Sequence, residues 1–116
     1  MSSFLEVGLV SDFRDGAMRK ISAGGREILV ARVGGRFFAA DSRCPHLNAD
    51  LSEGSLQGTI LTCPMHHSRF DLTDGHVIRW TDLTGIKLAY ASRTIPPKPL
   101  KIYPVKTDEE KILIAL

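Results

Sequence analysis

Each of the two cysteines in this chain is followed closely by a histidine. Cys44 and His46 lie in a C-P-H segment, and Cys63 and His66 lie in a C-P-M-H segment after the intervening residues 47–62. Thiolate sulfur and neutral imidazole nitrogen both bind transition metals well. The spacing therefore predicts a metal centre to which each of two loops contributes one cysteine and one histidine.

Two kinds of metal centre use two thiolates and two imidazoles. A structural zinc ion takes four such ligands in a tetrahedron, and zinc fingers usually group the cysteines together and the histidines together. A mixed-ligand [2Fe–2S] cluster instead has two thiolates on one iron and two imidazoles on the other. Because each loop here carries one ligand of each type, the pattern favours the iron–sulfur cluster, with zinc as the alternative.

The same residues also have ordinary structural interpretations. A single cysteine usually acts as a small buried apolar residue, but two matched pairs in proline-containing loops argue against coincidence. His67 follows His66 directly and is a competing ligand, whereas His76 is expected to be solvent-exposed beside a turn. If both cysteines bind metal, none is left for a structural disulfide, which suits a reducing compartment.

The elements that must position these loops are predicted to be strands. Apolar patterns over 17–22, 26–33 and 36–40 are joined by Gly24-Gly25 and Gly34-Gly35, which are typical hairpin turns. The continuous apolar run 28–31 indicates a strand that is buried on both faces. The third of these strands ends just before the first ligand loop.

The second ligand loop is predicted to lie between further short strands. Residues 54–58 read as a turn, residues 59–62 as a strand leading to Cys63, and residues 69–72 and 76–78 as a hairpin around 73–75. A last pair spans 100–106 and 111–116, in which Pro104 must lie where no ladder hydrogen bond is needed. Residues 80–94 fit neither the helical nor the strand period, and the prolines of 95–99 exclude a helix interior.

Together these patterns predict an all-β fold, an antiparallel domain spanning residues 1–116 with a metal-binding subdomain inserted at about 42–82. A chain of 116 residues and 12.8 kDa is one domain, with 43% apolar and 24% charged residues, as in ordinary globular proteins. A net charge of +2 without a basic stripe argues against nucleic-acid binding. The N-terminal segment lacks the features of a signal peptide, and no apolar run is long enough to cross a membrane, so we expect a cytoplasmic protein.

The two ligand segments resemble the two boxes of the Rieske iron–sulfur family. They read C-P-H-L-N from Cys44 and C-P-M-H-H-S-R-F-D from Cys63. More narrowly, they are similar to those of the small Rieske ferredoxins that serve bacterial aromatic-ring dioxygenases. Weaker similarity covers most of the chain, including residues 33–39, 54–58 and 99–105. The resemblance implies two β-sheets, in a sandwich or barrel, with a separate cluster-binding subdomain.

The resemblance also implies a role for each residue of the two boxes. Cys44 and Cys63 would bind the inner iron, and His46 and His66 the outer iron of one Rieske cluster per chain. Further residues would surround the cluster, with Ser68 as a donor to a bridging sulfide and Pro97 in a shielding loop. Phe70 takes the place of a tyrosine whose hydroxyl binds a ligand sulfur in membrane-complex relatives. Ala49 and Met65 take the places of two cysteines that form a clamping disulfide in those relatives.

The function implied is that of a diffusible one-electron carrier, which is not itself an enzyme. It would take electrons from a reductase and pass them to a terminal oxygenase, most simply as a monomer. The docking face would surround the histidine ligands with Pro45, Leu47, Pro64, Met65 and His67. The alternatives are a small subunit of a larger redox enzyme such as nitrite reductase, and a structural zinc or redox-sensing module. Without the tyrosine hydroxyl and the disulfide, the reduction potential is expected at the low end of the Rieske range, around −150 mV.

Overall fold

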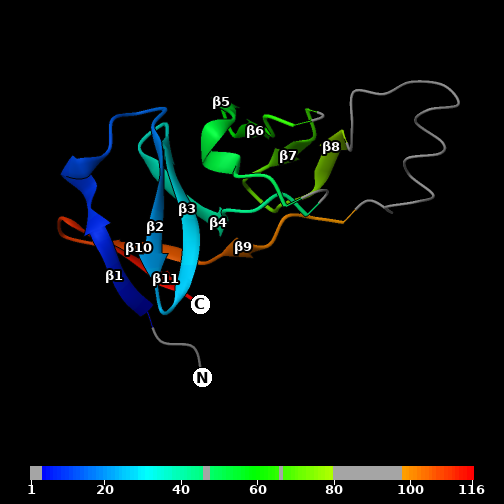
Figure 1. Ribbon diagram of the computed structural model, residues 1–116. Helices are drawn as coiled ribbons and strands as arrows, with labels where there is room; N and C mark the ends of the chain where they lie inside the picture. The colour runs from blue at the N-terminus through cyan, green and yellow to red at the C-terminus, as the bar shows by residue number, and fades with distance from the viewer. Residues whose placement is uncertain (1–3, 46–47, 66, 80–97) are drawn as a thin grey trace, which may run out of the picture.

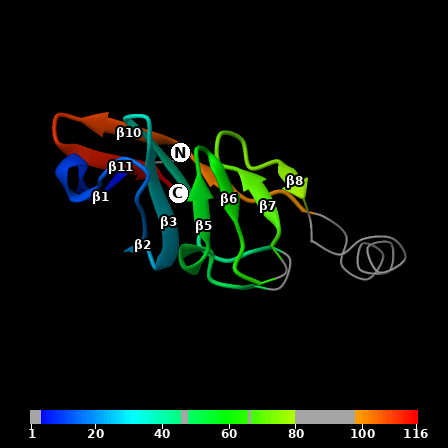
Figure 2. The ribbon, with the colours of Figure 1, turned by 90° about the horizontal axis from the view of Figure 1, so that it is seen from above.

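The computed structural model describes residues 4–45, 48–65, 67–79 and 98–116. Over these ranges the chain forms three antiparallel sheets and two short 3₁₀ helices. The sheets follow one another along the molecule, with the sheet β2-β3-β4-β9 between the other two (Figures 1 and 2). The all-β class predicted from the sequence is confirmed.

The middle sheet contributes to two separate cores. It contains β2 (Met18–Ala23), β3 (Arg26–Val33), β4 (Arg36–Asp41) and β9 (Ile102–Tyr103). Side chains alternate across a strand, so Ile28 and Val30 of β3 pack toward the first sheet while Leu29 and Ala31 pack toward the third. The continuous apolar run 28–31 is therefore buried on both faces, as predicted.

The first sheet is formed by both ends of the chain. Its order is β1 (Phe4–Leu9), β11 (Lys111–Ala115) and β10 (Val105–Asp108). Strand β1 is not predicted by the residue pattern, because Glu6 and Gly8 interrupt the apolar residues of the first ten positions. The register of β1 against β11 shifts between these two residues, and this irregularity explains why strand periodicity did not reveal β1.

Pro104 divides a stretch that the sequence analysis predicted as one strand over 100–106. The residues before it form β9 in the middle sheet, and those after it form β10 in the first sheet. Proline has no amide hydrogen to give to either ladder, while its carbonyl accepts from Ala115 N–H at 3.0 Å. The prediction of a single strand was wrong, but the expected position of Pro104 outside the donor ladder is confirmed.

The third sheet belongs to the segment between the two ligand loops and the residues just after it. It contains β5 (Ser55–Gln57), β6 (Ile60–Thr62), β7 (Arg69–Asp71) and β8 (Val77–Arg79), all antiparallel. The turn predicted over 54–58 is wrong in part, because Ser55–Gln57 pairs with β6 and the chain turns at Gly58 and Thr59. This sheet packs its buried face on the middle sheet through Leu61, Phe70 and Leu72.

Some expectations fall on residues that the structure does not describe. The unassigned stretch 80–94 and the proline-rich segment up to Pro97 lie outside the described residues. Within the described ranges, no helix has the length and apolar character needed to cross a membrane.

Candidate metal centre

The first ligand loop leaves β4 and is closed by its own backbone. Cys44 N–H donates to the carbonyl of Ala49 at 2.8 Å, and Asn48 N–H donates to the carbonyl of Cys44 at 2.8 Å. Asn48 has a φ of 63°, a left-handed conformation that asparagine tolerates better than most residues. These bonds return the chain to the 3₁₀ helix η2 (Leu51–Glu53), whose first amide donates to the carbonyl of Ser42.

The second ligand loop connects β6 to β7 in a similar way. Cys63 N–H donates to the carbonyl of Ser68 at 2.8 Å, which fixes the two ends of the loop against each other. His67 has a φ of 55°, again left-handed although it is not a glycine. Both loops are thus short, closed turns in which a non-glycine residue adopts a conformation of higher energy.

The two cysteine side chains meet in the buried interior. Both are free thiols, with 2% of Cys44 and 1% of Cys63 exposed, and both belong to the core between the middle and third sheets. Burial raises the pKa of the Cys63 thiol to about 11, partly offset by the Met65 backbone amide, which donates to its sulfur. The Cys44 side chain, in hydrogen-bond contact with Cys63, raises that pKa further.

This environment fits a pair of thiolates that share a metal ion. Two adjacent thiolates in an apolar interior repel each other and lack hydration, so a cation between them is needed to stabilise their charge. The raised pKa of Cys63 means that metal binding must displace a proton from this sulfur. The chemistry of the donor pair is therefore that of a buried metal centre with two sulfur ligands.

The remaining predicted site residues divide into described and undescribed ones. Ser68 and Phe70 are fully buried and engaged in contacts, and Phe70 shares the core with both cysteines. Met65 is exposed at 49%, and His67 is also exposed. His46, Leu47, His66 and Pro97 lie outside the described residues. Within the described ranges, no group of three or more metal-binding side chains occurs.

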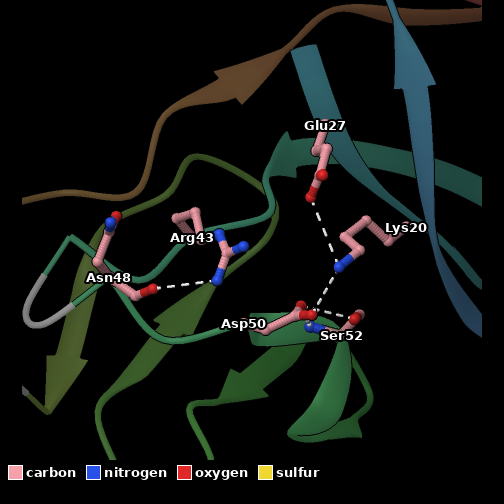
Figure 3. Close-up of polar contacts among 6 residues, drawn as sticks. All are labelled: Lys20, Glu27, Arg43, Asn48, Asp50 and Ser52. Carbon is pink, nitrogen blue, oxygen red and sulfur yellow. Dashed lines mark hydrogen bonds and ion pairs between the residues drawn. The ribbon is translucent and has the colours of Figure 1, made fainter.

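Sequence reasoning missed the polar contacts that support the first loop (Figure 3). Asp50 accepts hydrogen bonds from the Ser52 amide at 3.0 Å and from the Ser52 hydroxyl at 2.6 Å. It also forms an ion pair with Lys20 at 2.7 Å. The Lys20 ammonium and the Ser52 donors lower the pKa of Asp50 to about 2. The D-L-S segment signals this helix cap, but no local pattern identifies Lys20 on β2 as its partner.

A known family matches most of this chain, including both ligand loops. The family model of the Rieske [2Fe-2S] domain matches residues 3–104. This chain belongs to the Rieske family. It therefore carries a Rieske [2Fe-2S] cluster, as the cysteine–histidine spacing predicted, and the alternative of a zinc site is not supported.

Two curated relatives of this Rieske protein are ferredoxins. The ferredoxin component of the naphthalene 1,2-dioxygenase/salicylate 5-hydroxylase systems of Ralstonia sp is 28% identical over 114 residues, 98% of this chain and 96% of the relative. Ferredoxin CarAc of Metapseudomonas resinovorans is 37% identical over 73 residues, 62% of this chain and 68% of the relative. The Rieske protein described here is accordingly a ferredoxin of the kind found in bacterial aromatic dioxygenase systems.

A solved structure supports the same assignment of fold. The complex of reduced oxygenase and oxidized ferredoxin in carbazole 1,9a-dioxygenase matches with a TM-score of 0.76 and 28% identity, over 97% of this chain and 92% of that chain. The Rieske fold and the electron-transfer role predicted from the two boxes are confirmed.

Proposed function

We propose that Cys44 and Cys63 bind one iron of the Rieske cluster and that His46 and His66 bind the other. The observation that carries this assignment is the contact between the two buried thiols, each at the start of a closed loop. Each of these loops contains one of the two histidines, two or three residues after its cysteine. The four residues together complete the ligand set of a Rieske centre.

The cluster, when bound, accepts and releases one electron at a time. The protein supplies the surroundings that decide how easily this happens. Two thiolates and two neutral imidazoles leave a formal charge of about zero on the oxidised centre, so reduction is easier than with four thiolates. The Met65 amide, which donates to the Cys63 sulfur, stabilises negative charge on that ligand.

We further propose that the ferredoxin transfers electrons from a reductase to the terminal oxygenase of an aromatic-ring dioxygenase system. A related ferredoxin has been solved in complex with such an oxygenase. Pro64, Met65 and His67 are exposed at the second ligand loop and would contact the partner together with Pro45. A small, partly apolar face of this kind suits a brief encounter.

Electron transfer to an oxygenase tests this function directly. The chemically reduced protein, mixed with the terminal oxygenase of a naphthalene or carbazole system, should be oxidised much faster than without it. Met65→Glu should slow this transfer through a charge at the docking face, while the visible spectrum stays unchanged. A reduced protein that no such oxygenase reoxidises would contradict the proposed partner.

The location and the oligomeric state belong to the same proposal. A diffusible carrier that meets two partners in turn is expected to be a cytoplasmic monomer. Size-exclusion chromatography with light scattering should give a mass near 12.8 kDa. Copurification with a large redox subunit would instead favour the alternative of a fixed subunit, as in nitrite reductase.

A further inference from the structure

Arg79 contacts the second ligand loop from the last strand of the third sheet. Its guanidinium donates two hydrogen bonds to the carbonyl oxygen of His67, from Nε at 3.1 Å and from Nη2 at 2.9 Å. His67 is the residue directly after the expected ligand His66, and it holds a left-handed backbone. Two donors in a rigid fork therefore meet one carbonyl at a residue with a left-handed backbone.

The first ligand loop has a weaker contact of the same kind. The Arg43 guanidinium donates from Nη1 to the carbonyl of Asn48 at 3.4 Å (Figure 3). Asn48 is the left-handed residue of its own loop and follows the expected ligand His46 by two positions. Of the three non-glycine residues with positive φ in the described ranges, two follow an expected histidine ligand, and both give their carbonyl to an arginine.

We infer that Arg79, and to a smaller degree Arg43, are positioning residues that hold the ligand loops in their cluster-binding conformation. A left-handed non-glycine residue is stable only where its surroundings fix it. The charged donors lower the energy of that backbone by binding its carbonyl. This inference rests on the proposed ligand set and adds to it the groups that keep the second histidine-bearing turn in place.

The same arginines place positive charge beside the loops. Reduction adds one negative charge to the centre, and a fixed guanidinium nearby favours the more negative state. Two bonds to the His67 carbonyl hold the charge of Arg79 beside the second ligand loop. The two effects, loop positioning and charge, are separable by substitution.

Arg69 offers a matched control on the neighbouring strand. It pairs directly with Arg79 in the register of β7 and β8, and it carries the same charge. Within the described ranges, no hydrogen bond or ion pair of the Arg69 side chain is found. Arg69→Gln thus removes one positive charge near the loop without removing a bond to it.

The test compares Arg79→Gln, Arg79→Lys and Arg69→Gln in the cluster-loaded protein. Two readouts report on the loop: amide hydrogen exchange over residues 60–70 by mass spectrometry, and the rate at which visible absorbance is lost with an iron chelator. Arg79→Gln should speed both about five- to tenfold, the scale of a partly exposed charged hydrogen-bond pair. Arg69→Gln should stay within about twofold of the unmodified protein.

The lysine variant separates position from charge. Arg79→Lys keeps the charge but loses the fork, so its exchange and cluster loss should move toward those of Arg79→Gln. Its midpoint potential should lie nearer that of the unmodified protein, whereas Arg79→Gln and Arg69→Gln should both shift the potential downward.

Arg43→Gln should speed cluster loss less than Arg79→Gln does, because Arg43 makes only one, longer bond to the Asn48 carbonyl.

Equal exchange and equal cluster loss in Arg79→Gln and Arg69→Gln would overturn the inference. Exchange over residues 26–33, in β3, should be unchanged in every variant and verifies folding. If Arg79→Gln does not fold, Arg79→Lys decides by the same comparison. An unmodified protein that never holds a two-iron cluster would instead refute the proposed ligand set, so the two failures are distinguishable.

Discussion

At the scale of single residues, two adjacent histidines in the second loop have different expected roles. His67 uses its carbonyl to bind Arg79, and its side chain is exposed. His67→Asn should therefore retain the cluster, because asparagine also tolerates the left-handed backbone. His66→Asn should lose it. Iron and labile sulfide per chain, measured after purification, check both variants, and loss of iron in the His67 variant alone would reassign the ligand.

Asp50 carries a pH dependence of stability. The Lys20 ion pair and the Ser52 donors lower the pKa of this carboxyl from 3.8 to about 2, so its contribution is complete above about pH 5 and disappears as the pH falls toward 2. Asp50→Asn keeps a capping oxygen but loses the ion pair with Lys20, so it should lower the free energy of unfolding at neutral pH.

The free energy of unfolding in urea checks the prediction for Asp50. The difference between the unmodified protein and Asp50→Asn should be constant from about pH 7 to 5 and should shrink below about pH 4. Glu27→Gln, which removes the longer 3.5 Å contact to the same lysine, should cost less. A difference that does not depend on pH would mean that Asp50 stabilises the loop by packing alone.

At the scale of elements, Gly54 allows β5 to approach the strand that leads to Cys63. A Cβ atom at this position would lie 2.0 Å from the carbonyl oxygen of Thr62. Gly54→Ala should therefore displace β6 and lower stability by about 3 kcal/mol, with partial loss of the cluster. Gly58→Ala is the control, since a Cβ at this position meets nothing within 4 Å. This substitution should cost only about 1 kcal/mol, because residue 58 has a left-handed backbone. Thermal unfolding curves with equal midpoints for the two variants would contradict this prediction.

How far the elements were predictable depended on how local their signals are. The hairpins at Gly24-Gly25 and Gly34-Gly35 and the doubly buried β3 follow from turn chemistry and residue pattern alone. The change of sheet at Pro104 does not, because it depends on which strands lie beside the chain on either side of the proline. The short β5 was not predictable, since three residues between two glycines carry too little periodicity to indicate a strand.

At the scale of the whole molecule, both cysteines lie in the apolar core between the middle and third sheets. Phe70 is fully buried in the core that contains both cysteines, where a tyrosine would add a hydroxyl donor. Fewer donors to sulfur disfavour the reduced state. We expect a midpoint potential around −150 mV, the low end of the Rieske range. A redox titration that gives a midpoint above about +100 mV would contradict this prediction.

The site was predictable where its chemistry is written in adjacent residues. The two cysteine–histidine spacings were enough to predict the cluster, because few metal centres combine thiolate and imidazole in this way. The supporting contacts were not predictable, since Arg79 lies twelve positions from His67 in the sequence and Lys20 lies thirty positions from Asp50. Such partners are set by strand register, which a single sequence does not specify.

Pulsed EPR of the dithionite-reduced protein, combined with iron and sulfide analysis, tests the mixed ligation most directly. The proposed ligands predict two irons and two labile sulfides per chain, with hyperfine coupling to two ¹⁴N nuclei. His46→Asn and His66→Asn should lose the iron, the sulfide and the EPR signal together. One zinc ion without iron, or a two-iron cluster that shows no nitrogen coupling, would contradict it.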